Sequence, residues 1–327
     1  MKKILPFIFV FALLAIACER TGHLRLPEHE IKLVVNAQWN PGIPMWVHLS
    51  RSYGTTELVN NNDLLIPDAT VSIWENGVKL EDFIYRDTSR YELNRFGSDD
   101  TLLVKYGQYM HPARDTVKPG SHYQLRIHHP DYDDIVADCR VPTPVKIDTI
   151  RVFFDAVTET DLSNASTTYH IIEIQVDDPP GEDNYYGLNM TRVYTSPDSS
   201  HADTVIIHEN IVPLVNSYGL NTLVPAGSIV FSDEGHDGEQ ISKLFYVIKR
   251  TQFSIQGDPL IPERYIFHLY SMNKSLAGYF EGRFKQDQEL DQDNLLYVPG
   301  AASVSSNIEG GYGVFGAEVA TTYTVSF

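Results

Sequence analysis

Short runs of alternating apolar and polar residues, separated by turn-forming residues, follow one another along most of this chain. Such alternation places every second side chain on the same face of a strand. In residues 45–49 the apolar side chains at odd positions share one face, and Trp46 and His48 share the other. The dipeptide Asn76-Gly77 between two such runs is typical of a tight two-residue hairpin. The pattern predicts a fold built from strands.

The spacing of the turns predicts a mostly β protein with two domains. We expect residues 31–142 to form an immunoglobulin-like β-sandwich and residues 143–327 to form a second β-rich domain. The boundary falls at Pro142-Thr143-Pro144, because two prolines remove two backbone donors and favour a stiff, extended connector.

One amphipathic helix is expected near residues 273–285 in the second domain. Its apolar face follows the helical spacing, and Ser271 or Asn273 is a suitable N-terminal cap; the residues of that face are Leu276, Tyr279, Phe280 and Phe284. Four glycines then fall between residues 310 and 316. Glycines tolerate backbone conformations that side chains forbid, so we interpret this segment as a tight structural corner before a last strand at residues 321–327.

The first eighteen residues have the pattern of a lipoprotein signal. Two lysines precede an apolar run over residues 4–17, which is too short to span a bilayer comfortably. The segment Leu14-Ala15-Ile16-Ala17-Cys18 resembles a bacterial lipobox. We therefore expect residues 1–17 to be a signal peptide, Cys18 to be lipidated and to attach the chain to membrane lipid, and residues 18–30 to be a tether. The alternative is a secreted protein that is cleaved nearby.

Charge and cysteine content narrow the function further. Removing residues 1–17 leaves 23 basic against 43 acidic residues, a net charge of −20. Such acidity excludes nucleic acid as a partner. If Cys18 is lipidated, Cys139 has no partner for an intramolecular disulfide. Cys139 lies in an alternating run, so we interpret it as a buried strand residue and not as a nucleophile.

The acidic segment over residues 233–239 is the best candidate for a ligand site. Carboxylates beside a histidine are suited to acid–base chemistry or to ligand binding, and we single out Asp233, Glu234, His236 and Asp237. An exposed loop is the competing interpretation, because two glycines and no apolar residue accompany them. The segment from His128 to Asp134 offers metal-ligand residue types, but adjacent strand histidines point to opposite faces and cannot easily share one ion. We interpret this segment as a hairpin tip, because its proline and aspartates are typical of a turn. No motif predicts catalytic residues, a metal site or a cofactor.

Several ordered segments carry a resemblance that covers nearly the whole chain. After the lipobox come residues 26–36 and 47–52, the hairpin at Asn76-Gly77, residues 178–186 with the sequence DPPGEDNYY, and residues 306–316 with the sequence SNIEGGYGVFG. This order resembles the domain-of-unknown-function 4249 lipoprotein family of Bacteroidota. The resemblance implies an envelope lipoprotein, a mostly β architecture and genes beside TonB-dependent outer-membrane receptors. It implies no reaction and no site residues.

These observations together predict a lipid-anchored outer-membrane protein that binds rather than catalyses. We expect it to act beside a TonB-dependent receptor in nutrient uptake, with an unknown small ligand. Which side of the outer membrane it faces is left open. Two alternatives remain: an envelope hydrolase that uses the acidic loop at residues 233–239, and a structural surface protein whose domains are spacers.

Overall fold

The structure is a computed structural model, and all elements named below lie between Lys32 and Ser326. It describes residues 29–54, 57–59, 63–87, 90–93, 101–104, 107–160, 166–195, 204–209, 212–213, 222–224, 228–249, 260–290 and 304–326. Cys18 and the predicted signal peptide lie outside these residues. Contacts divide the chain into two units, of which Lys32–Ser52 with Leu58–Phe327 is the larger and carries every element named here. No helix within the described residues is long and apolar enough to cross a bilayer.

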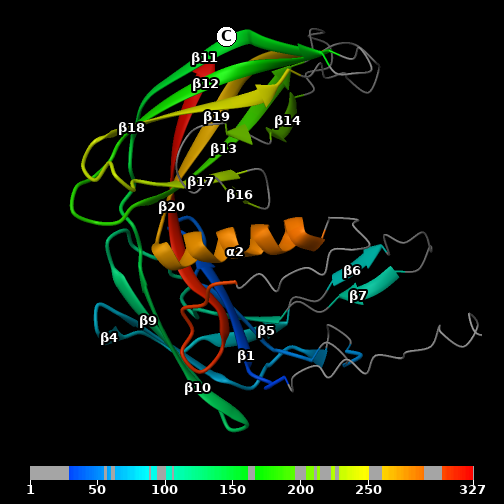
Figure 1. Cartoon of the computed structure of the whole chain (residues 1–327). Coiled ribbons are helices and arrows are strands. Elements are labelled where there is room, and N and C mark those ends of the chain that lie inside the picture. Colours follow the sequence, from blue (N-terminus) through cyan, green and yellow to red (C-terminus); the bar gives the residue numbers. More distant parts are fainter. Residues whose placement is uncertain are drawn as a thin grey trace, which may run out of the picture. The chain divides into compact units, whose positions relative to one another are not determined.

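The first half of the chain is a series of strands joined by turns (Figure 1). These strands are β1 (Leu33–Trp39), β2 (Trp46–Arg51), β3 (Thr70–Glu75), β4 (Val78–Lys79), β5 (Ile84–Asp87), β6 (Arg90–Leu93), β7 (Thr101–Val104), β8 (Gly107–Met110), β9 (His122–His129) and β10 (Tyr132–Arg140). The predicted hairpin is confirmed, because Asn76 and Gly77 have positive φ angles of 50° and 82° between β3 and β4. The predicted faces of β2 are also confirmed: Val47 and Leu49 are buried, and Trp46 and His48 lie on the other face.

The second half contains longer strands and the one helix that the described residues contain. Its elements are β11 (Ile147–Thr160), β12 (Ser166–Asp177), β13 (Tyr185–Thr195), β14 (Thr204–Glu209), β15 (Val212–Pro213), β16 (Thr222–Val224), β17 (Ser228–Ser232), β18 (Gln240–Ile248), β19 (Ile261–Met272), α2 (Lys274–Leu290) and β20 (Tyr312–Ser326). The predicted mostly β class with one amphipathic helix is confirmed. No strand was expected where β19 lies, and the last strand, β20, begins nine residues before its predicted start at residue 321.

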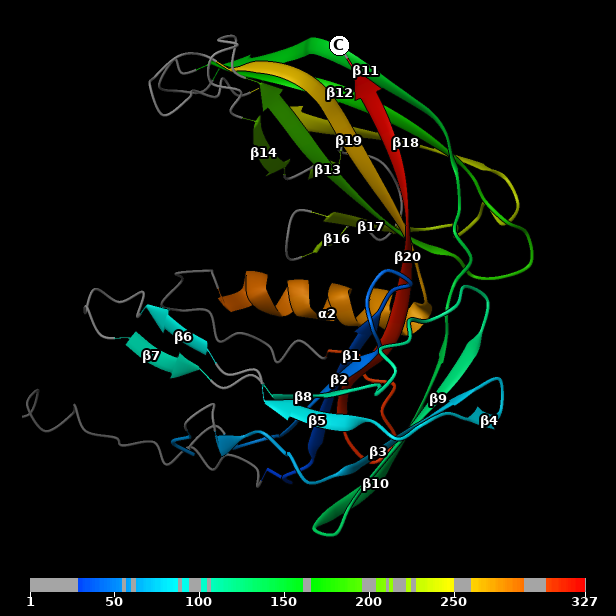
Figure 2. The ribbon, with the colours of Figure 1, turned by 180° about the vertical axis from the view of Figure 1, so that it is seen from behind.

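The last strand joins the two halves of the fold. Residues 312–317 of β20 pair in parallel with β1, and residues 318–326 pair antiparallel with β19. β20 thus continues one ten-stranded sheet from the N-terminal to the C-terminal strands, as the red strand in Figure 1 and the reverse view in Figure 2 show. The predicted boundary near residue 142 stays a prediction, but both halves of the fold require the C-terminal strand.

The described residues form three hydrophobic cores, and two of them lie between this sheet and a second sheet. The first contains residues of β1 and β2 together with residues of β3, β9 and β10, so a four-stranded sheet covers the N-terminal strands. Phe315 and Ala317 of β20 belong to this core, and the Phe315 ring meets Trp39 edge to face at 4.7 Å. The second core lies between β13, β17 and β19 on one side and β11, β12 and β18 on the other. Each half is therefore a two-layer arrangement of sheets.

Asn273 fixes the start of α2 at the place where β20 changes partner. Its Oδ1 accepts hydrogen bonds from the backbone N–H of Leu276 (3.3 Å) and of Ala317 (3.3 Å). Its backbone N–H donates to the carbonyl of Ala317 at 3.1 Å. The predicted cap at Asn273 is confirmed, and the same side chain holds the helix against β20. Leu276 is fully buried there beside Met272.

The glycine-rich segment is a structural corner, as predicted, but most of it belongs to β20. Gly310 turns the chain with a φ of 81°, and a Cβ on it would overlap the carbonyl oxygen of Asp134. The Asn307 side chain then imitates a strand partner for Phe315: its Nδ2 donates to the Phe315 carbonyl at 2.8 Å, and its Oδ1 accepts from the Phe315 N–H at 3.0 Å. Backbone geometry thus accounts for this segment.

Candidate functional site

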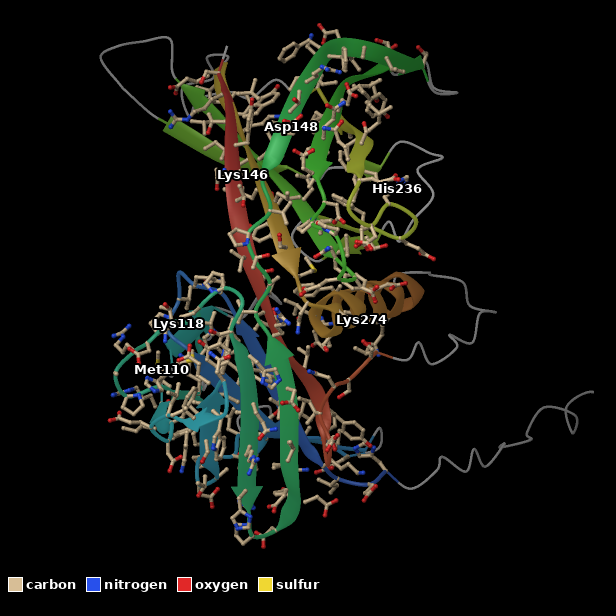
Figure 3. The ribbon with its side chains drawn as sticks, turned by 90° about the vertical axis from the view of Figure 1, so that its left-hand side faces the viewer. Met110, Lys118, Lys146, Asp148, His236 and Lys274 are labelled. Atoms are coloured by element: carbon tan, nitrogen blue, oxygen red, sulfur yellow. The ribbon has the colours of Figure 1, made fainter. Side chains whose placement is uncertain are left out.

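The acidic loop that the sequence singled out connects β17 to β18. Asp233, at its start, is buried with 6% of its surface exposed, whereas Glu234, His236 and Asp237 are exposed. His236 lies 3.5 Å from Glu239 within the same loop. Figure 3 shows His236 on this loop, apart from Lys274 at the start of α2. The loop is therefore buried at its start and exposed beyond it, and its four candidate residues do not form one cluster.

Three carboxylates from two loops meet at this place. Ligand-type oxygens of Asp178, Asp233 and Asp237 all lie within 4.8 Å of one another, and Asp178 is buried like Asp233. Asp178 comes from the loop between β12 and β13, at the start of the segment 178–186 that carries the family resemblance. The structure thus brings together two of the four predicted residues, adds Asp178, and leaves Glu234 and His236 aside.

Each of these carboxylates also accepts a hydrogen bond that ties the two loops together. Asp178 accepts the hydroxyl of Tyr186 and the N–H of Gly238, the latter at 3.0 Å. Asp233 accepts the N–H of Asn184 at 2.9 Å. Asp237 accepts the N–H of Gly181 at 2.6 Å. We call Asp178, Asp233 and Asp237 the acidic clamp.

The electrostatics of the acidic clamp follow from its burial. Burial raises the pKa of the Asp233 carboxyl, and the neighbouring Asp178 carboxylate raises it further, although the hydrogen bonds from Asn184 oppose the shift. Burial and the bond to Asp178 likewise raise the pKa of the Tyr186 hydroxyl. Oxygen ligands so close together have the chemistry to hold one divalent cation. Their hydrogen bonds already give them a structural task, which is to fix the loop at residues 178–184.

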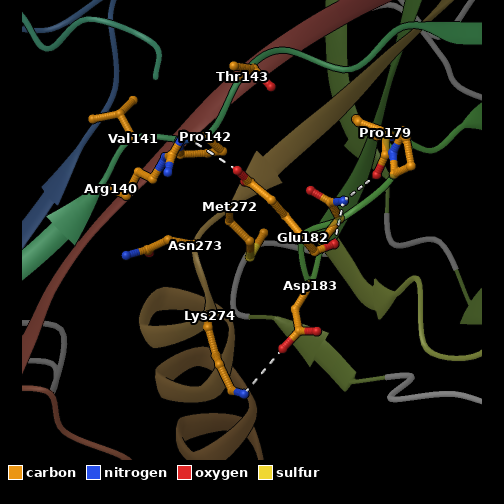
Figure 4. A pocket seen from close by; sticks show the side chains of 12 residues that line it. Arg140, Val141, Pro142, Thr143, Pro179, Glu182, Asp183, Met272, Asn273 and Lys274 are labelled. Atoms are coloured by element: carbon orange, nitrogen blue, oxygen red, sulfur yellow. Dashed lines mark hydrogen bonds and ion pairs between the residues drawn. The ribbon is translucent and has the colours of Figure 1, made fainter. Parts of the chain in front are cut away.

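That loop forms one wall of a cavity of about 280 Å³ (Figure 4). The end of β10, the loop between β12 and β13, and the start of α2 surround the cavity. Its lining residues are Arg140, Val141, Pro142, Thr143, Pro179, Pro180, Glu182, Asp183, Asn184, Met272, Asn273 and Lys274. We call this cavity the junction pocket. None of the four residues predicted from sequence lines it, but Asp233 holds Asn184 of its wall.

Four charged side chains face one another in pairs around the junction pocket. Arg140 Nη2 lies 3.4 Å from Glu182 Oε1, and Lys274 Nζ lies 3.5 Å from Asp183 Oδ2. These side chains are more than half exposed, so solvent screens each pair and the pairs contribute little to stability. Weak pairs of this kind can exchange their partners for the charges of a ligand at little cost in stability.

Asn184 connects the acidic clamp to the junction pocket. Besides its backbone bonds to Asp233, its Nδ2 donates to the carbonyls of Pro179 (3.1 Å) and Glu182 (2.9 Å). Through Asn184, the acidic clamp therefore fixes the positions of Glu182 and Asp183. Sequence reasoning missed the pocket because its residues come from three distant segments; the only local signal was the charge-rich sequence between Pro180 and Tyr185.

The other sequence candidates are structural. His128 and His129 point to opposite faces at the tip of β9 and β10: His128 pairs with Asp134 at 2.6 Å, and His129 lies 3.2 Å from Asp68. Cys139 is buried, and burial raises the pKa of its thiol to about 12. A thiol with so high a pKa stays protonated and does not act as a nucleophile at neutral pH.

Comparison with known proteins identifies the family. The family model Domain of unknown function (DUF4249) matches residues 22–324, so the chain belongs to this family. No curated protein matches. Among solved structures, a "Biofilm associated protein - B domain" is 8% identical over 74% of this chain and 80% of that one, with a TM-score of 0.17. A "Biofilm associated protein - BSP domain" is 8% identical over 77% and 58%, with a TM-score of 0.15.

Proposed function

We propose that this chain is a lipid-anchored protein of the bacterial outer membrane that binds a small charged ligand and works beside a TonB-dependent receptor. The anchor is Cys18, on the evidence of the lipobox pattern before it. The junction pocket carries the ligand-binding part of the proposal, because its lining combines two cationic and two acidic side chains with apolar ones. The partnership with a receptor rests on the gene neighbourhood that the family resemblance implies, and not on a residue of the site.

The chemistry of the junction pocket favours a zwitterionic ligand such as a short peptide. Arg140 and Lys274, together with the N-terminal end of α2, favour a carboxylate. Glu182 and Asp183 favour an ammonium group. Met272 and the prolines supply apolar contact for a side chain between the two charges. Binding of such a ligand needs no chemical group of the acidic loop at residues 233–239. We therefore propose binding and not hydrolysis.

Dialanine is a suitable probe of the junction pocket. We expect calorimetry to detect binding of dialanine by the full chain, and we expect N-acetylation or C-amidation of the probe to weaken binding about tenfold, since each removes one charge-assisted contact. Arg140→Ala and Lys274→Ala should weaken binding of dialanine to a similar extent. Lys146→Ala removes an exposed cation outside the pocket and should change nothing. Equal binding of the capped and free probes would contradict the proposed recognition.

The partnership is tested by cross-linking the tagged chain in its native outer membrane, capturing it, and identifying its partners by mass spectrometry. We expect stoichiometric recovery of a TonB-dependent receptor with the native chain. The Cys18→Ser variant should stay in the aqueous phase on detergent partitioning and should recover no receptor, because it lacks the acyl chains that hold the protein at the membrane. Recovery of the chain alone, with Cys18 shown to be lipidated, would argue for the spacer interpretation.

A further inference from the structure

The strand β11 bulges where it pairs with β12 at the edge of its sheet. Phe153 pairs with Ile171 and Val157 pairs with Tyr169, so four steps along β11 face only two steps along β12. Within this bulge Asp155 has a φ of 50°, a left-handed conformation that residues other than glycine rarely adopt. Such backbone persists only where neighbouring groups hold it. We call residues 153–157 the β11 bulge.

A buried histidine holds the β11 bulge through a ring lone pair. His170 on β12 is 5% exposed, and its Nδ1 accepts the backbone N–H of Asp155 at 3.0 Å. A ring nitrogen that accepts a hydrogen bond carries no proton, so this contact requires the neutral imidazole. The Asp155 carboxylate stands beside the ring, with Oδ1 at 3.6 Å from Nδ1, and Lys249 Nζ holds its other oxygen at 2.8 Å.

The surroundings of His170 oppose its protonation. The titratable and charged side chains that face the imidazole, or contact those that do, are Asp155 of β11, Lys249 after β18, Arg192 and Tyr194 of β13, and Tyr265 of β19. Burial lowers the pKa of the imidazole, the positive charges of Arg192 and Lys249 lower it further, and the Asp155 carboxylate opposes them. His170 is therefore neutral at neutral pH and gains a proton under more acidic conditions than an exposed histidine does.

We propose that His170 and Asp155 form a pH-sensitive switch, which keeps the β11 bulge closed while the imidazole is neutral and opens it when the imidazole is protonated. A proton from solvent binds at Nδ1, which then faces the Asp155 N–H as a second donor and can no longer accept it. The new ring N–H donates to the nearby Asp155 carboxylate instead. Without its acceptor, the Asp155 backbone leaves the left-handed conformation and the β11 bulge rearranges.

The switch acts on apolar side chains that the closed β11 bulge displays to solvent. Phe153, Phe154 and Val157 are 47%, 50% and 40% exposed, and the Phe154 ring packs edge to face on the imidazole itself at 5.2 Å. Opening of the β11 bulge therefore changes the apolar surface that this edge of the sheet presents. The switch shares no residue with the junction pocket or the acidic clamp, so it is independent of the proposed ligand binding.

Hydrogen exchange of the Asp155 amide in the full chain, measured by NMR between pH 8 and pH 5, tests the switch. After correction for intrinsic exchange, we expect protection of this amide to fall by up to about thirtyfold, because the open form binds a proton with an ordinary histidine pKa of about 6.5. His170→Asn should remove the pH dependence, since its Oδ1 can accept the same N–H and does not titrate. His129→Asn is the matched control: His129 is equally buried and accepts the Asp131 N–H at 3.1 Å, but it lies outside the β11 bulge. It should leave exchange at Asp155 unchanged.

Lys249→Met provides a second test at a side chain that is 48% exposed, where a change should not prevent folding. It removes a positive charge near His170 and frees the Asp155 carboxylate for the imidazolium, so the loss of protection should begin at a higher pH than in the native chain. An unchanged onset would overturn the proposal even if His170→Asn fails to fold. Protection that does not change with pH in the native chain, or that changes equally in the native chain and in His170→Asn, would also overturn it.

Discussion

Gly313→Ala is expected to prevent stable folding of the chain, with a loss of unfolding free energy on the order of 4 kcal/mol or more. Gly313 lies on β20 opposite Val35 of β1 and has a φ of 104°. A Cβ at this position would overlap the carbonyl oxygen of Val35. Val35 is fully buried, so β1 cannot move aside without opening the first core. The expected result is a large fall in the denaturant midpoint, measured by circular dichroism.

Gly77→Ala is the matched control for this variant. Gly77 also has a positive φ, of 82°, but nothing lies within 4 Å of a Cβ placed on it. An alanine there should cost only the backbone penalty of about 1–2 kcal/mol. The difference in unfolding free energy between the two variants measures the effect of the close approach of β20 to β1 at Gly313. If both variants lose the same amount of stability, β20 does not pack against β1 as the structure has it.

Individual strands and tight turns could be predicted, because the alternation of apolar and polar residues indicates which face of a strand is buried. The pattern of β2 and the Asn76-Gly77 turn needed no information beyond neighbouring residues. The strand β19 carries the same signal, since Tyr265, Phe267 and Leu269 alternate into the second core, but Pro262 near its start obscured it. The parallel pairing of β20 with β1 joins the two ends of the chain, and no local pattern specifies such a partner.

The candidate sites show the same division between local and distant information. Asp233 and Asp237 stood out because they are close in sequence, whereas Asp178 becomes their neighbour only through the pairing of β12 with β18. Burial is a property of the assembled fold, so these residues could not be ranked from sequence.

Glu318 is expected to make the protein less stable as the pH rises from about 4.5 to about 7. It stands on β20 opposite Met272, immediately after the residue at which β20 leaves β1. Burial raises the pKa of its carboxyl from 4.5 to about 7, and its charge contributes to the raised pKa of the neighbouring Tyr270. In this interval the folded state binds more protons at Glu318 than the unfolded state does, so unfolding becomes easier with increasing pH. The shift corresponds to a loss of about 3 kcal/mol by pH 7.5.

Glu318→Gln should remove this dependence, because a neutral amide has no charge to desolvate. We expect the variant to have nearly the native stability at pH 4.5 and to be more stable than the native chain at pH 7.5, by up to about 3 kcal/mol. Glu234→Gln, at an exposed position in the acidic loop, should leave the pH profile unchanged. Denaturant unfolding across this pH range measures the effect. If Glu318→Gln and the native chain have parallel profiles, Glu318 is charged and solvated in the folded protein. That result would mean that the Glu318 carboxylate does not destabilise the fold at the place where β20 passes from the first core to the second.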